Sequence, residues 1–108
     1  MSEAAIQKRV MIEATRLGLR VFRNNVGVLK DRRGIPVTYG LCVGSTDLIG
    51  WTPKGQFVAI ECKTEIGIVS PEQKNFLQQV SKAGGFACIC RNEKNLKLAL
   101  DAYYMRVY

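Results

Sequence analysis

Apolar residues first recur at helical spacing, three or four positions apart, close to the N-terminus. Ser2 stands just before this stretch and is a good N-cap, and Gly18 follows its last apolar position. The spacing predicts a first helix that ends before Gly18 and buries one face, formed by Ile6, Val10, Ala14 and Leu17.

Four shorter apolar runs have the length and composition of β-strands. They are residues 19–24, 47–51, 56–62 and 86–90. The turn-forming sequence Thr52-Pro53-Lys54-Gly55 separates the second run from the third and predicts an antiparallel hairpin. Residues 27–40 are polar, basic and rich in glycine, so we expect a long basic loop or an irregular hairpin there.

Two further helices are predicted by their first residues. Ser70 is an N-cap, Pro71 takes the first helical position and Gln73 the third, and this helix ends at Gly84. Asn92 caps a last helix with the apolar residues Leu96, Ala99, Leu100 and Tyr103. The predicted order α-β-β-β-α-β-α defines an α/β fold, a mixed sheet with helices packed on it. A chain of 108 residues has room for one domain, spanning residues 1–108.

Charge indicates the kind of partner. The chain carries 16 Lys and Arg against nine Asp and Glu, a formal net charge of +7, and residues 1–33 hold eight of the bases. This excess favours a polyanion, with nucleic acid as the best candidate and a basic surface kept for solubility as the alternative. No apolar run approaches the ~20 residues that cross a bilayer, and the N-terminus does not resemble a signal peptide. We therefore expect a cytoplasmic protein with no membrane partner.

The residues available for chemistry are restricted. Four cysteines occur without any histidine, and Cys88 and Cys90 alternate within an apolar run, so they are expected to be core residues and not zinc ligands. The missing histidine also excludes mechanisms that use imidazole as a base. Any hydrolysis must therefore use carboxylates, lysine and a metal.

The predicted hairpin brings three such residues together. Asp47 opens one strand, and Glu61 and Lys63 lie near the end of the other, on one face because alternate residues of a strand share a face. A four-residue turn that pairs Trp51 with Gln56 sets Asp47 one position away from Glu61. A shift of one residue sets the two carboxylates directly opposite. The alternative is an exposed strand end with an ordinary cross-strand ion pair.

Two carboxylates beside an ammonium group suit Mg²⁺, which prefers hard oxygen ligands. Such an ion polarises a phosphodiester and acidifies water, while Lys63 orients or deprotonates that water. The pattern predicts metal-assisted phosphodiester hydrolysis with Mg²⁺, for which Mn²⁺ substitutes. Trp51 and Tyr39 either stack on nucleic-acid bases or pack within the protein.

Five short motifs occur in an order that resembles the PD-(D/E)xK nuclease superfamily. The two central ones are Gly44-Ser45-Thr46-Asp47 and Ile60-Glu61-Cys62-Lys63. The chain resembles in particular the virus-type replication-repair nuclease (VRR-NUC) family in its stand-alone form, through Glu3…Ile6-Gln7…Val10, Arg23-Asn24-Asn25-Val26-Gly27 and Ser70-Pro71-Glu72-Gln73. The resemblance runs from about Glu3 to Cys90 and implies a restriction-endonuclease-like mixed sheet flanked by helices. Thr46 departs from the motif, which often has proline there.

The resemblance implies roles for the matched residues. Asp47 and Glu61 would ligate the metal, with the main-chain carbonyl of Cys62 as a third ligand. Lys63 would be the catalytic lysine. Glu3 continues the apolar face of the first helix and would approach the site, unless it is only an acid favoured by the helix dipole.

Three polar residues have more than one interpretation. Gln73 belongs to the site, or completes the capping box of its helix, or does both. Asn24 and Asn25 either line the path of the substrate or make turns.

The resemblance also implies a substrate and an assembly. Stand-alone members that this chain resembles are junction-resolving enzymes, so we expect a homodimer that cuts branched DNA, with a four-way (Holliday) junction as substrate and DNA repair as its setting. A two-fold dimer would place one active site at each of two symmetry-related phosphates. The alternatives are a monomeric, weakly selective nicking nuclease, a non-catalytic nucleic-acid-binding module of the same fold, and a small basic assembly subunit. A phage-encoded member would act in the host cytoplasm.

Overall fold

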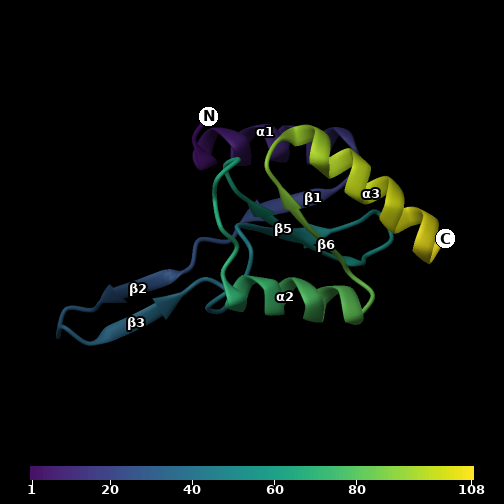
Figure 1. Ribbon diagram of the computed structural model, residues 1–108. Coiled ribbons are helices and arrows are strands. Elements are labelled where there is room, and N and C mark those ends of the chain that lie inside the picture. The colour runs from purple at the N-terminus through teal and green to yellow at the C-terminus, as the bar shows by residue number, and fades with distance from the viewer.

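The computed structural model describes residues 1–108 as three helices and six strands (Figure 1). In chain order the elements are α1 (Glu3–Arg16), β1 (Arg20–Arg23), β2 (Gly27–Lys30), β3 (Pro36–Tyr39), β4 (Leu48–Trp51), β5 (Phe57–Cys62), α2 (Pro71–Lys82), β6 (Phe86–Cys90) and α3 (Glu93–Val107). Each helix begins at its predicted cap, because the side chains of Ser2, Ser70 and Asn92 each accept a backbone N–H from the first turn. No helix combines the length and hydropathy that crossing a bilayer requires.

Four strands form the central sheet, in the order β1-β4-β5-β6. Strand β4 is antiparallel to both β1 and β5, whereas β5 and β6 are parallel and are connected through α2. Helices α1 and α3 cover one face of the sheet and α2 covers the other (Figure 1). The predicted α/β fold, a mixed sheet flanked by helices, is confirmed.

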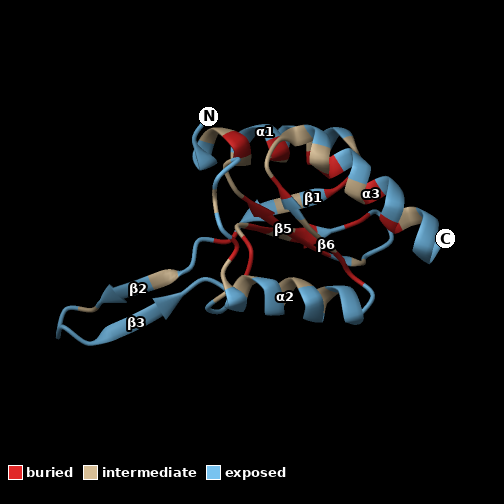
Figure 2. Ribbon diagram, viewed as in Figure 1, coloured by how far each residue is buried: buried red, intermediate tan, exposed pale blue.

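The hydrophobic core lies between the sheet and the pair α1 and α3, where buried residues gather (Figure 2). Strand β5 is its centre, because Val58, Ile60 and Cys62 are fully buried in the core cluster. The alternate residues Ala59 and Glu61 face α2 instead. Glu61 therefore lies between the sheet and the first turn of α2, outside the apolar layer.

The register between β4 and β5 differs from the predicted one by one residue. Trp51 pairs with Phe57 and not with Gln56. Continued by one position past the ladder, this register sets Asp47 opposite Glu61, and hydrogen bonds between the two segments agree with that. The shifted register that the sequence left open is therefore the one that forms.

The turn between these strands explains the shift. It spans residues 52–56, and the Thr52 N–H donates to the Gln56 carbonyl at 2.9 Å. The Thr52 side-chain oxygen also accepts the N–H groups of Lys54 and Gln56. A hydroxyl that organises its own turn in this way favours the longer connection over the four-residue turn that was predicted.

Residues 27–40 were predicted as a loop or an irregular hairpin, and they form a regular antiparallel hairpin of β2 and β3. We call residues 27–39 the arm, since they project from the body of the molecule (Figure 1). At its tip Asp31 Oδ1 accepts the N–H groups of Arg33 and Ile35, and Gly34 adopts a positive φ of 79°. The order of elements is therefore α-β-β-β-β-β-α-β-α, two strands more than predicted.

Candidate active site

Two carboxylates are held against each other where β4 begins and β5 ends. Asp47 directly precedes β4, and its N–H donates to Glu61 Oε1 at 3.3 Å. In return Asp47 Oδ2 accepts the N–H of Cys62 at 3.0 Å. Each carboxylate thus receives a main-chain hydrogen bond from the other strand, which fixes the orientation of both side chains.

Lys63 completes the group. Its Nζ lies 3.4 Å from Glu61 Oε2, and its side chain is only 13% exposed. The Lys63 N–H donates to the carbonyl of Cys90 at 3.0 Å, so the main chain beyond β5 stays aligned with β6. The ammonium group is therefore aimed at the carboxylates by the sheet itself.

Gln73 has both of the roles considered for it. Its Oε1 accepts the N–H of Ser70 at 2.9 Å, which completes the capping box of α2. Its Nε2 donates to Glu61 Oε2 at 2.9 Å. One amide side chain thus caps the helix and fixes the orientation of a buried carboxylate.

Glu61 is a buried carboxylate with a perturbed pKa. Its side chain is 1% exposed. Its pKa is raised from 4.5 to about 7, because burial and the nearby Asp47 charge together outweigh the lowering effect of Lys63. A bound cation would favour the ionised form strongly, because two carboxylates share this small space.

The Cys62 side chain points away from this group into the core. Burial raises the pKa of its thiol well above the ordinary range, and the neighbouring Cys90 contributes in the same direction. A thiol that stays protonated is no metal ligand. A metal-ligand role for Cys62 could therefore involve only its main-chain carbonyl, the ligand that the resemblance implies. All four cysteines are free, and Cys88 and Cys90 pack in or against the core as predicted.

Glu3 is not brought into the group. It is exposed in the first turn of α1 and makes no hydrogen bond or ion pair. Its charge still contributes to the raised pKa of the Cys62 thiol, so it lies within electrostatic reach of the site. No three Asp, Glu, Cys or His side chains lie close enough together to hold a metal by themselves. The acidic centre consists of Asp47 and Glu61.

Asn24 braces the chain next to Asp47, a role that the sequence interpretation missed. It is 8% exposed, and its N–H donates to the Asp47 carbonyl at 2.7 Å. Its Nδ2 donates to Ser45 Oγ and to the Thr46 carbonyl, and its Oδ1 accepts the N–H of Leu41. Because residues 24 and 41 flank the arm, Asn24 ties both ends of the arm to the segment that carries Asp47. Asn25 is exposed.

A second brace holds the loop that follows Lys63. Arg91 Nη1 donates to the carbonyls of Thr64 and Gly67, at 2.5 and 2.9 Å. A single arginine after a strand carries no sequence signal for this role, because its partners are main-chain atoms 24 and 27 residues away.

The space in front of Asp47 is a cavity of about 410 Å³ between the Gly44 turn and the start of α2. Gly44 has a φ of 85°, and a Cβ there would lie 2.8 Å from Glu72 Cβ, so only glycine permits this close packing. The cavity is mostly polar and is lined by Asn24, Asn25, Val26, Val43, Gly44, Ser45, Asp47, Ser70, Glu72 and Gln73.

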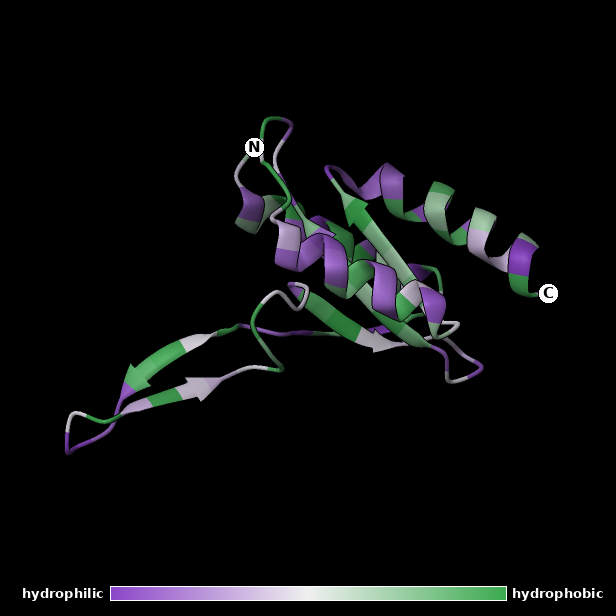
Figure 3. Cartoon of the chain, turned by 60° about the horizontal axis from the view of Figure 1, so that its bottom comes forward, coloured by the Kyte–Doolittle hydropathy of each residue, from purple (hydrophilic) through white to green (hydrophobic).

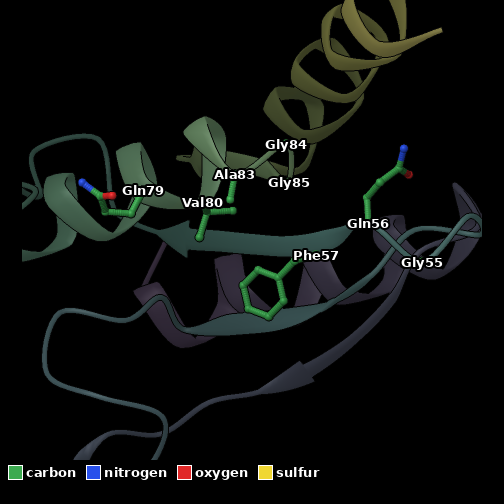
Figure 4. A pocket seen from close by; sticks show the side chains of 8 residues that line it. All are labelled: Gly55, Gln56, Phe57, Gln79, Val80, Ala83, Gly84 and Gly85. Atoms are coloured by element: carbon green, nitrogen blue, oxygen red, sulfur yellow. The ribbon is translucent and has the colours of Figure 1, made fainter.

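A second cavity, of about 460 Å³, lies at the other end of α2 (Figure 4). Its polar side chains are Gln56 and Gln79, and Phe57, Val80 and Ala83 supply apolar surface. It contains no acid, base or thiol, so it offers nothing for hydrolysis.

The donor set of the acidic centre fits a hard divalent cation. Both side chains offer carboxylate oxygens, and Asp47 Oδ1 makes no hydrogen bond within the chain. The absence of histidine and the protonated thiols make softer metals a poor match.

The mixed sheet, with an acidic pair and a lysine at the ends of two adjacent strands, defines the class of the protein. This class is the PD-(D/E)xK nucleases, hydrolases that act on DNA and generally use divalent metals. Within it the chain belongs to the VRR-NUC family, whose domain it matches over residues 2–94. No curated protein matches the chain. The resemblance drawn from the five motifs is confirmed.

Proposed function

We propose that the chain, acting as one domain over residues 1–108, is a Mg²⁺-dependent endonuclease that hydrolyses phosphodiester bonds in DNA at Asp47, Glu61 and Lys63. One observation carries the proposal. The two carboxylates are joined by reciprocal main-chain hydrogen bonds, with the Lys63 ammonium 3.4 Å from Glu61 Oε2. An ordinary cross-strand ion pair would not need a carboxylate that is 1% exposed and faces a second acid.

Asp47, Glu61 and the main-chain carbonyl of Cys62 hold the ion in this proposal. When bound, Mg²⁺ supplies a Lewis acid that polarises the scissile phosphate and acidifies water. Lys63 Nζ orients the attacking water, takes its proton or offsets the charge that develops on the phosphate. Gln73 keeps Glu61 in place through its Nε2. Glu3 supports the site from the first turn of α1 through its charge.

Metal dependence is tested with supercoiled plasmid. Mg²⁺ or Mn²⁺ should support cleavage, because carboxylate oxygens suit both ions. Ca²⁺ should support DNA binding with little cutting, since its coordination is looser and it polarises the phosphate less. Cutting that persists in EDTA would remove the proposed mechanism.

We further propose that the enzyme is a homodimer that acts on branched DNA, with a four-way junction as its substrate. It would act in the cytoplasm, which for a phage-encoded chain is the cytoplasm of the host. The net charge of +7 supports contact with several duplex arms, and a two-fold axis would present two active sites to two symmetry-related phosphates. Light scattering should report about twice the 12.1 kDa chain mass, and nicks should be paired across the junction. A monomer that cuts linear duplex equally well would contradict this part and leave the nuclease proposal standing.

A further inference from the structure

The arm and the residues that flank it expose an unusual share of the chain's apolar surface. Twenty large apolar residues are exposed in the whole molecule, and eight of them lie between residues 26 and 43. Five of these eight lie in the arm, where β2 is largely hydrophobic and the tip is hydrophilic, although the arm projects away from the body (Figure 3). Scattered exposed apolar residues need no explanation, but a contiguous group marks an interaction surface.

The exposed residues of the arm form a continuous apolar face. Leu29 pairs directly with Val37, so the two side chains stand on the same face of the hairpin. Ile35 lies two positions before Val37 along the chain and Tyr39 two positions after it, so both stand on the same face as Val37. These side chains are between 43% and 66% exposed. The opposite face has Val28 beside polar and proline side chains.

The rest of the chain does little to stabilise the arm. Strands β2 and β3 form their own two-stranded sheet, and every residue in them except Gly27 is exposed. An isolated two-stranded hairpin is marginally stable in water, and it becomes stable when one face packs against something else. The arm therefore needs a partner to cover the face of Leu29 and Val37.

We propose that the partner is a second copy of this chain, packed through Leu29, Ile35, Val37 and Tyr39 of both copies. The inference deepens the proposed homodimer and rests on it. In a two-fold contact each apolar face meets an identical apolar face, which makes it self-complementary. The bases Lys30, Arg32 and Arg33 lie only at the tip, where Asp31 pairs with Arg33 at 3.1 Å. Two arms that cross in opposite directions keep these tips apart, so like charges do not oppose the contact.

The neighbouring residues extend the contact toward the active site. A specific dimer buries about 800 Å² on each partner, more than the four side chains of the face provide. Val26, Leu41 and Val43 continue the exposed apolar surface at the root of the arm. Val26 and Val43 also line the cavity in front of Asp47. The second copy would therefore lie beside the catalytic cavity.

Light scattering on a matched set of variants tests the interface. Leu29→Ser with Val37→Ser removes the centre of the apolar face, and the double variant should have the mass of one chain. The control, Leu98→Ser with Met105→Ser, changes two residues of α3 that are 71% and 85% exposed and should keep the wild-type mass of two chains. A Leu29/Val37 variant that stays a dimer overturns the inference and leaves the dimer of the proposed function intact.

A second measurement uses the wild-type protein, so it does not depend on the folding of any variant. Amide hydrogen exchange at residues 27–39 should speed up on dilution, with no change in the core strand β5. A wild-type chain that is monomeric throughout would overturn both the interface and the proposed dimer. Plasmid nicking would still show whether the nuclease proposal holds. If the wild-type chain is monomeric and the Leu29→Ser/Val37→Ser variant binds DNA more weakly than it does, the arm binds DNA. That result also overturns the inference.

Discussion

The acidic centre and the arm differ in how their side chains are satisfied. At the acidic centre the buried carboxylate has its partners within the chain: Glu61 is 1% exposed and contacts Asp47, Lys63 and Gln73. In the arm both strands are exposed and pair only with each other. The two regions are nevertheless joined directly, through the hydrogen bonds of Asn24.

This difference separates two kinds of region. At the acidic centre, bonds within the chain already hold the two carboxylates and Lys63 together. The arm is electrostatically unremarkable and lacks a surface to cover its apolar face. We therefore expect substitutions at the acidic centre to affect chemistry, and substitutions in the arm to affect assembly.

The largest effect should come from removing a carboxylate or the lysine. Asp47→Asn or Glu61→Ala should abolish metal binding and lower the cleavage rate about 10³-fold or more, since metal and charge stabilisation are lost together. Lys63→Ala should lower turnover about 10²-fold or more while sparing DNA binding. Plasmid nicking and fluorescence anisotropy measure the two quantities. Asp101→Asn, which changes an exposed acid of α3 away from this cavity, is the control. Wild-type rates in all three variants would show that the active site lies elsewhere.

The metal-free protein should lose stability as pH rises through the titration of Glu61. Its pKa is about 7 in the folded state against 4.5 as the ordinary value, so between these pH values the folded state binds more protons than the unfolded state. Stability then falls from about pH 4.5 to pH 7, by roughly 1–3 kcal/mol, and the cost is fully present above pH 7. Glu61→Gln should flatten this part of a urea-unfolding profile, whereas Asp101→Asn, at an exposed acid of α3, should not. An identical slope in wild type and Glu61→Gln would contradict the raised pKa.

The side-chain hydrogen bonds of Asn24 connect the arm to the segment that carries Asp47, and a substitution at Asn24 removes them. Asn24→Ala removes its side-chain hydrogen bonds to Ser45, Thr46 and Leu41, and should cost about 1–3 kcal/mol of folding free energy. We expect cleavage to slow as well, because the segment that carries Asp47 loses its brace. Asn25→Ala, at the exposed neighbour, should change stability by less than about 0.5 kcal/mol. Equal effects of the two substitutions in chemical denaturation would argue against the brace.

The smallest effect separates the two roles of Gln73. Gln73→Ala should cost about 1 kcal/mol, since the reciprocal part of the capping box and the bond to Glu61 both disappear. Gln73→Glu keeps a residue that completes a capping box but replaces the amide donor with a third acid beside Glu61. It should therefore retain the helix cap yet cut DNA more slowly than wild type. Circular dichroism and nicking rates together report the two roles, and equal nicking by Gln73→Glu and wild type would leave only the cap.

Local patterns predicted most of the fold. The caps at Ser2, Ser70 and Asn92 depend on residues within one turn, so they could be identified from sequence alone. The register of β4 and β5 depended on the Thr52 side chain, which favours one of two turn lengths that composition does not distinguish. Strands β2 and β3 were missed as regular elements because strand patterns are recognised by a buried face, and the arm has none within its own chain.

The candidate site was predicted in its chemistry more than in its supports. Asp47, Glu61 and Lys63 could be brought together from strand alternation and one hairpin, and their catalytic roles stay predictions. Glu3 was expected to approach them and lies exposed in α1 without a bonded partner. The braces from Asn24 and Arg91 were not predictable, because their partners are mostly main-chain atoms 17 to 27 residues away.

The last helix shows that a sequence match and a folding unit need not have the same limits. The family match ends at residue 94, one residue after Glu93 begins α3. Beyond that limit Leu96, Leu100 and Tyr103 are almost fully buried, and the Tyr103 hydroxyl donates to the Gly84 carbonyl at 2.7 Å. A gene fragment trimmed to the shared module would keep every residue of the acidic centre and expose the core beneath α3. For cloning, transplantation or design, the boundary that matters here is set by packing and not by the extent of the sequence match.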